Sequence, residues 1–85
     1  MDSYSIELTK SAEKELRRID GRYIPRIFSA VEDLAKEPRP AGCKKLSGSV
    51  HTYRIRIGTY RVIYDIQESR LLVLVIKIGH RKDVY

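Results

Sequence analysis

Hydrophobic and polar residues alternate at the start of the chain and then change to a helical spacing. Tyr4, Ile6 and Leu8 are separated by polar residues, a period of two that predicts a short strand. Over residues 10–19 the apolar positions recur every three or four residues, which predicts an amphipathic helix. The hydroxyl of Thr9 is suited to cap the first turn of that helix.

A second amphipathic helix is predicted over residues 22–36, with Phe28 in its apolar stripe. Pro25 fits only in the first turn of this helix, where a missing N–H has no helical partner. Pro38 ends the helix, because the residue before a proline is pushed out of the helical region. The segment 38–48 is rich in proline, glycine and lysine, and it is predicted to be a loop.

Three further strands are predicted, over residues 50–57, 60–66 and 70–78. Gly58-Thr59 joins the first two as a type II′ turn, with glycine in its first central position. The last segment is apolar on both faces, which is typical of a central strand. The order β-α-α-β-β-β predicts an α+β fold, with two N-terminal helices packed on a mainly antiparallel four-stranded sheet. We expect one domain over the 85 residues, 1–85.

The chain carries an excess of positive charge. Its 17 Lys and Arg residues against 11 Asp and Glu give a formal net charge of +6. That balance favours a polyanionic partner, with nucleic acid as the first candidate. A soluble basic protein without such a partner could have the same net charge, so the distribution of the cations has to distinguish between these two possibilities.

The sequence indicates neither a targeting segment nor a membrane span. The first residues lack the basic start and the apolar stretch of a signal peptide. The longest apolar run, residues 71–76, is too short to cross a bilayer. Cys43 is the single cysteine, so no internal disulfide can form, and a lone thiol fits a reducing compartment. We therefore expect a cytoplasmic protein without a membrane partner.

Arginines gather on one face of the predicted hairpin. Arg54 and Arg56 lie two residues apart and therefore leave the same face of one strand. Across the two-residue turn, Arg56 is expected to pair with Arg61, which brings a third guanidinium to that face. Converging cations repel one another unless an anion lies between them. The alternative is an ordinary solvated strand face, which alternates in the same way.

Polar side chains with possible chemistry follow the last predicted strand. Gly79 precedes His80 and Arg81, and Tyr85 comes four residues after Arg81. Each of them alone is typical of a surface or terminal residue. The case for a site rests on the combination of a basic strand face with a tail that is expected to enter the same region. His51 has the parity of the core-facing residues of its strand, and it is interpreted as structural.

Four segments of the hairpin and the tail carry a family resemblance. They are Lys44-Lys45-Leu46-Ser47-Gly48, Tyr53-Arg54-Ile55-Arg56-Ile57, Gly58-Thr59-Tyr60-Arg61-Val62-Ile63-Tyr64 and Ile78-Gly79-His80-Arg81-Lys82-Asp83-Val84-Tyr85. With these segments the chain resembles the RelE/ParE superfamily of type II toxins over nearly its whole length. The Tyr-Arg of the hairpin is shared widely across the superfamily, whereas the ending resembles the RelE branch.

The resemblance implies a ribosome-dependent endoribonuclease that cuts mRNA in the decoding A site. In that reaction the 2′-hydroxyl of the substrate attacks the adjacent phosphate, giving a 2′,3′-cyclic phosphate and a free 5′-hydroxyl, with no metal or cofactor. By position, Arg61 matches a phosphate-stabilising arginine, Arg81 an arginine of transition-state stabilisation and leaving-group protonation, and Tyr85 a tyrosine that stacks on or orients the substrate. Further substrate-binding residues are expected at four positions: Lys44, Lys45, Arg54 and Arg56.

Two positions depart from the family. Arg54 and Arg56 stand where RelE itself has lysines, one of which is assigned the role of general base. Arginine stays protonated at physiological pH, so it can clamp a phosphate but is a poor base. An imidazole can accept or donate a proton near neutral pH, and we therefore expect His80 to be the main proton-transfer residue.

Two other functions are compatible with this resemblance. A ParE-like toxin poisons DNA gyrase, and it has no need of a proton-transfer group. A non-catalytic module of the same fold would use the arginines to bind RNA or the ribosome without cleavage. The resemblance also implies a cognate antitoxin whose helical segments wrap the toxin. The expected partners are therefore the ribosome, mRNA and an antitoxin, and the toxin alone is not expected to bind DNA.

Overall fold

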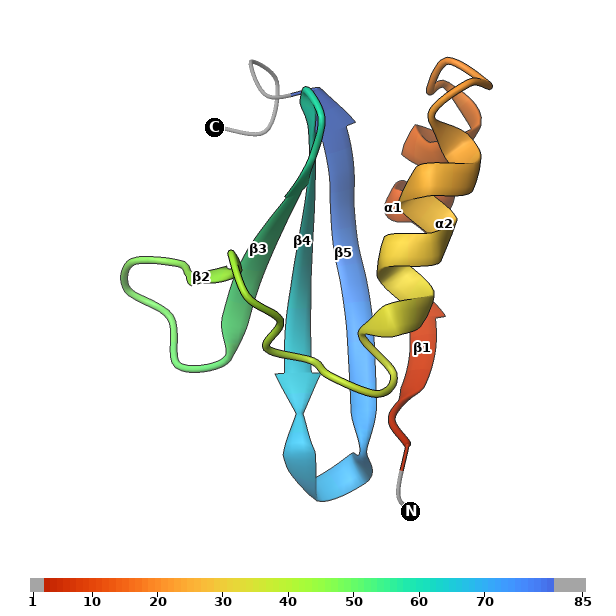
Figure 1. Ribbon diagram of the computed structural model, residues 1–85. Coiled ribbons are helices and arrows are strands. Elements are labelled where there is room, and N and C mark those ends of the chain that lie inside the picture. The colour runs from red at the N-terminus through yellow and green to blue at the C-terminus, as the bar shows by residue number, and fades with distance from the viewer. Residues whose placement is uncertain (1–2, 81–85) are drawn as a thin grey trace.

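The computed structural model describes residues 3–80, which form two helices and five strands (Figure 1). In chain order they are β1 (Ser5–Leu8), α1 (Lys10–Arg17), α2 (Ile24–Asp33), β2 (Lys44–Lys45), β3 (Thr52–Ile57), β4 (Tyr60–Gln67) and β5 (Leu72–His80). A short 3-10 turn, Glu68–Arg70, joins β4 to β5. No helix within the described residues has the length and apolar content needed to cross a membrane.

The five strands form one sheet in the order β1-β5-β4-β3-β2. β1 pairs with β5 in parallel, and every other pair of neighbours is antiparallel. Both helices cover the same face of the sheet (Figure 1). The predicted α+β fold, the order of the elements and the mainly antiparallel sheet are therefore confirmed. In the described part of the chain, no helix covers the other face of the sheet.

The predicted number of four strands is wrong, because residues 44–45 form a fifth strand. Lys44 pairs with Arg54 and Lys45 with Tyr53, inside the segment predicted to be a loop. Two residues are too few to show an alternation of polar and apolar side chains. Exposed lysines on an edge strand also discourage further pairing with another chain.

Both helices are shorter than the hydrophobic pattern predicts. The Thr9 hydroxyl caps α1 as predicted, accepting a hydrogen bond from the Ala12 N–H at 3.1 Å. Pro25 lies in the first turn of α2, also as predicted. Beyond α2, the N–H groups of residues 34–36 bond to carbonyls three residues back. The apolar spacing therefore continues into tight turns after the α-helix has ended.

The hydrophobic core lies between the two helices and the sheet. Phe28 was predicted in the buried stripe of the second helix but is 49% exposed. Phe28 lies beside a surface hollow that Leu8, Leu16 and Ile24 also line. The buried residues come from α1, from α2 and the turn after it, and from the inward positions of β3, β4 and β5; they include Ala12, Ile27, Val31, Leu34, Ile55, Ile57, Val62, Tyr64, Val73, Val75 and Ile78.

Tyr64 ties the loop after α2 to this core. Its buried hydroxyl donates a hydrogen bond to the Pro38 carbonyl at 2.8 Å. In the same loop, Arg39 donates a hydrogen bond to the Tyr53 hydroxyl and forms an ion pair with Glu68. Burial raises the pKa of Tyr64 well above the ordinary value for a phenol. The loop that leads into β2 is therefore held against the sheet at two points.

The folded protein should lose stability above about pH 10, because Tyr64 ionises there in the unfolded chain while burial keeps it protonated in the fold. This contribution is complete below that pH and disappears as the pH rises toward the folded pKa. Tyr64→Phe removes the group from the titration, at a cost of about 1–3 kcal/mol for the unpaired Pro38 carbonyl. Urea unfolding at neutral pH and at about pH 10.5 measures both effects. Equal losses with pH in the two proteins would contradict the expectation.

Candidate functional site

The predicted arginine cluster forms on the sheet face that the helices leave uncovered. Arg56 pairs with Arg61 across the β3–β4 hairpin, as predicted, and Arg54 lies two residues back along β3. Side chains directly opposite each other on antiparallel strands have Cβ atoms about 4.5–5.5 Å apart. On its other side Arg61 pairs with Gly79 of β5, so that neighbour adds no side chain beside it.

A tight turn fixes the register of these arginines. Gly58 has a φ of 61°, in the left-handed region that favours glycine. Thr59 is not among the described residues with positive φ, and this combination is the one a type II′ turn requires. A two-residue turn sets one register for the hairpin, so Arg56 and Arg61 must face each other.

Arg54 is a buried cation. Its exposed fraction is only 6%, and that of Arg61 is the same. Among the described residues, the Nε–H of Arg54 has no hydrogen-bond partner. A buried cation costs free energy unless an anion or an acceptor compensates for it. Phosphate oxygens accept charge-assisted hydrogen bonds from arginine, so Arg54, with Arg61 on the adjacent strand, forms a site suited to a phosphate.

The two lysines of β2 lie on opposite faces of the sheet. Lys44 pairs with Arg54 and shares its face. Lys45 pairs with Tyr53, whose ring packs against the core on the helix side. Lys45 was expected to bind substrate, but the fold does not bring it to the arginines. The name arginine face is used below for four residues: Lys44, Arg54, Arg56 and Arg61.

His80 projects from the opposite side of the sheet. Gly79 pairs with Arg61, so the next residue along β5 pairs with Tyr60 and points toward the helices. The His80 ring makes an edge contact with the Tyr60 ring, with 5.7 Å between the ring centres. The expected convergence of His80 with the arginines is therefore not observed. Consecutive residues of a strand point to opposite faces of the sheet. His80 therefore lies on the face opposite to Arg61, although its neighbour Gly79 pairs with Arg61.

The other expected site residues of the tail, Arg81 and Tyr85, lie outside the described residues. Within residues 3–80, no three or more His, Cys, Asp or Glu side chains gather in a group that could hold a metal ion. What the arginine face offers to a ligand is electrostatic: hydrogen-bond donors and positive charge for an anion.

Three aromatic rings meet at the hairpin end of the sheet, on the helix side. The Tyr60 ring contacts the His80 ring and also the Tyr23 ring, whose centre lies 5.2 Å away. The Arg26 guanidinium lies 5.8 Å from the centre of the Tyr23 ring. This group was not predicted from the sequence, because Tyr23 is far from Tyr60 along the chain. The available signal was the hairpin register, which puts Tyr60 on the face opposite to Arg61.

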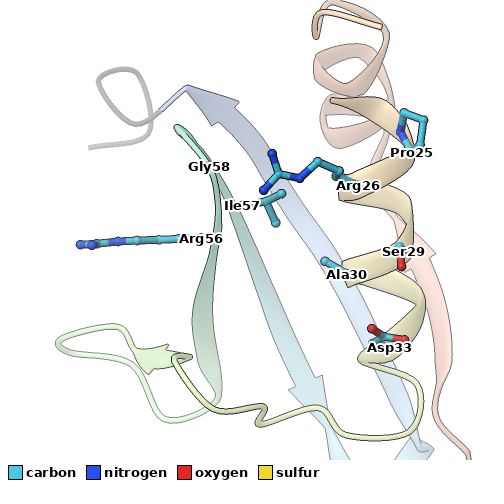
Figure 2. A pocket seen from close by; sticks show the side chains of 8 residues that line it. All are labelled: Pro25, Arg26, Ser29, Ala30, Asp33, Arg56, Ile57 and Gly58. Atoms are coloured by element: carbon cyan, nitrogen blue, oxygen red, sulfur yellow. The ribbon is translucent and has the colours of Figure 1, made fainter. Parts of the chain in front are cut away.

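A hollow of about 490 Å³ separates α2 from the outer edge of β3 (Figure 2). Arg26, Ser29 and Asp33 line its helix side, and the Gly58 turn closes one end. Arg56 also borders it, but its side chain points away from α2 (Figure 2). The hollow therefore lies next to the arginine face without being part of it.

Comparison with known proteins identifies the family. Residues 6–85 match the family model described as the ParE toxin of type II toxin–antitoxin systems, parDE. The toxin RelG of Mycobacterium tuberculosis is 29% identical, over 96% of this chain and 95% of its own. The mRNA interferase toxin RelE of Escherichia coli is 24% identical, over 94% of this chain and 85% of its own.

A solved structure supports the same relationship. The RelE of the RelE–RelB complex from Pyrococcus horikoshii superimposes with a TM-score of 0.83 at 26% identity, covering 96% of this chain and 99% of that one. The resemblance inferred from the hairpin and the tail is thereby confirmed. This chain belongs to the ParE toxin family of type II toxin–antitoxin systems, within the RelE/ParE superfamily, and its relatives are toxins of the RelE branch.

Proposed function

We propose that this toxin is an mRNA interferase that cleaves messenger RNA in the ribosomal A site. The observation that carries the proposal is the pair Arg54 and Arg61, two guanidiniums buried on the sheet face that has no helices. The net charge of +6 supports a polyanionic partner. The activity named for the Escherichia coli relative supports RNA cleavage. A protein acting on translating ribosomes works in the cytoplasm.

The proposed reaction takes place within the substrate. The 2′-hydroxyl oxygen attacks the adjacent phosphorus, the bond to the 5′ oxygen breaks, and a 2′,3′-cyclic phosphate and a 5′-hydroxyl result. The phosphorane gains negative charge, which Arg54 and Arg61 neutralise from fixed positions. Lys44 and Arg56 bind the flanking backbone at the same face. These cations supply the charge that a metal ion would otherwise provide.

The tail completes this proposal. By its match to the family, Arg81 stabilises the transition state and protonates the 5′ oxygen as it leaves, and Tyr85 orients the substrate. The side chain of His80 points to the helix side, so the arginine face does not include it. Charge stabilisation is therefore the part of the reaction that the residues of the arginine face account for.

A gyrase inhibitor is the second candidate, because the matching family model is described as a ParE toxin. Arg54 favours the nuclease, since a phosphate provides an acceptor for its Nε–H, which has no partner within residues 3–80. A binding module without activity is the third candidate, because arginine retains phosphate binding where it cannot act as a base.

Primer extension on mRNA in programmed ribosomes tests the proposal. We expect new ends within the A-site codon when the protein is present, and their loss with Arg81→Ala. In parallel, supercoiling by DNA gyrase is expected to be unaffected by the same concentration of protein. Inhibition of gyrase without mRNA cleavage would favour the ParE-like function. Binding to ribosomes without either effect would favour the binding module.

We also propose a cognate antitoxin that covers the helix layer. The solved Pyrococcus horikoshii relative was crystallised with RelB, which supports such a partner. The exposed Phe28 and the hollow of about 430 Å³ that it forms with Leu8, Leu16 and Ile24 supply the apolar surface. Exposed apolar patches of this kind are typical of protein–protein contacts. Glu13 and Arg17 also line the hollow, so a partner helix with residues of both charges beside its apolar face would complement it.

A further inference from the structure

We propose that the hollow at the end of β5 holds an unpaired RNA base, stacked on the ring of His80, next to the phosphate bound on the arginine face. The inference rests on the proposed function, because it takes the ligand to be RNA. It gives His80 a role in binding a base instead of in moving a proton. The hollow has a volume of about 360 Å³ and is bordered by α1 on one side and the end of the sheet on the other.

The rings beside this hollow provide a stacking surface. Tyr60 and His80 both line it, and the two rings meet edge to face with 5.7 Å between their centres. His80 is exposed, so its ring is accessible to a ligand. The Tyr60 ring is held from behind by Tyr23, 5.2 Å away. Stacking on aromatic side chains is how proteins bind unpaired bases irrespective of sequence.

Gly79 connects the hollow to the arginine face. It borders the hollow, and on the neighbouring strand it pairs with Arg61. Adjacent strands lie about 4.7–4.9 Å apart, so Arg61 and the hollow are separated by little more than one strand. Gly79 itself adds no side chain between them. In this proposal one nucleotide spans the two sites, with its phosphate on Arg61 and its base against His80.

Polar groups at the wall of the hollow can read the edge of the base. The Glu15 carboxylate is fixed there, because its Oε1 accepts a hydrogen bond from the Ile78 N–H at 3.1 Å. Its Oε2 lies 3.7 Å from the Lys77 ammonium, a separation that leaves room for a closer donor. Arg18 supplies donors on the same wall. A carboxylate only accepts hydrogen bonds, so it can accept one from the exocyclic amino group of adenine, whereas uracil has a carbonyl oxygen at the corresponding position and only its N3–H as a donor.

The test measures the affinity for short 2′-O-methyl RNA strands, which cannot undergo the 2′-hydroxyl attack, at one fixed salt concentration. His80→Ala is expected to weaken binding roughly 5- to 150-fold, the range for loss of one base stack. His80→Phe keeps a stacking ring and should bind like the wild type. His51→Ala is the matched control, because His51 is exposed beside Asp65, near the opposite end of the β3–β4 hairpin. Glu15→Gln is expected to reduce the preference for oligo(A) over oligo(U).

The same variants are then compared for mRNA cleavage in programmed ribosomes. Retention of cleavage by His80→Phe supports stacking, because phenylalanine cannot exchange a proton. Equal affinity of His80→Ala and the wild type, or loss of cleavage by both His80 variants with unchanged affinity, overturns the inference. A wild-type protein that binds RNA through His80 but leaves ribosomal mRNA intact contradicts the proposed function and still supports the stacking site.

Discussion

Replacing Arg61 by alanine is expected to lower the rate of A-site cleavage by about 10²–10³-fold, the usual effect of removing one preorganised donor from a developing oxyanion. Arg61 pairs with Arg56 on one neighbouring strand and with Gly79 on the other, and it is only 6% exposed. Its place on the sheet is therefore set before the phosphorane forms. Single-turnover cleavage in programmed ribosomes measures the effect directly.

Two variants show how far this loss depends on the shape and the place of the positive charge, and thermal melts separate it from a loss of folding. Arg61→Lys keeps the positive charge but not the planar fork of donors, so we expect an intermediate rate. Arg17→Ala removes an equal charge from the helix layer and should leave cleavage unchanged. Thermal melts show whether each variant is folded at the assay temperature. A folded Arg61→Ala protein that cleaves at nearly the wild-type rate would show that the phosphate does not bind at this face.

Replacing Arg54 by methionine is expected to stabilise the free protein and to impair its reaction at the same time. Methionine fills a similar length with apolar atoms, and it removes the buried Nε–H that has no partner among the described residues. The free energy of unfolding is expected to rise by about 1–3 kcal/mol, which is the cost of an unsatisfied buried polar group. For a domain of this size, each kcal/mol raises Tm by about 4–8 °C.

Arg54→Met is expected to impair the cleavage of RNA. Loss of one partner from a desolvated charged contact costs at least about 2 kcal/mol, which is roughly a 30-fold loss in cleavage at low substrate concentration. Arg56→Met is the matched control for the change in stability, because Arg56 is exposed on the same strand and its removal relieves no buried charge. Inorganic phosphate should raise the Tm of the wild type but not of Arg54→Met. Destabilisation of the free Arg54→Met protein would mean that the guanidinium supports the fold and not a ligand.

The hairpin with its arginines could be predicted from the sequence because local chemistry determines it. Gly58 defines the turn, the turn defines the register, and the register brings Arg56 opposite Arg61. The edge strand at Lys44 could not be predicted in this way, because a two-residue strand has no period. Phe28 was misplaced because helical spacing gives the width of an apolar stripe but not which part of it the sheet will cover.

The predicted site differs most from the structure in the direction of the His80 side chain. The motif places it beside Gly79, and Gly79 pairs with Arg61, so proximity alone suggested a common site. The alternation of β5 puts the two side chains on opposite faces. The face of the sheet on which each residue of a predicted strand lies can be assigned only where the pairing of that strand is known. The bulge between Ile63 and Tyr64 shifts the register of β4 against β5, so that pairing could not be derived from the pattern.

The parallel pairing of β1 with β5 bears on the order in which the chain can fold during its synthesis. The β3–β4 hairpin is local and can form as soon as it emerges, with Arg56 and Arg61 already opposite each other. β1 is made first but has to wait for β5, and the hydrogen bond from the Thr9 hydroxyl to the Ile76 carbonyl spans 67 residues. Until that contact closes, α1 and β1 have no sheet to pack on. A newly made chain can therefore bring its arginine pair together before β1 and β5 meet, and the closing of the sheet is the step that completes the fold.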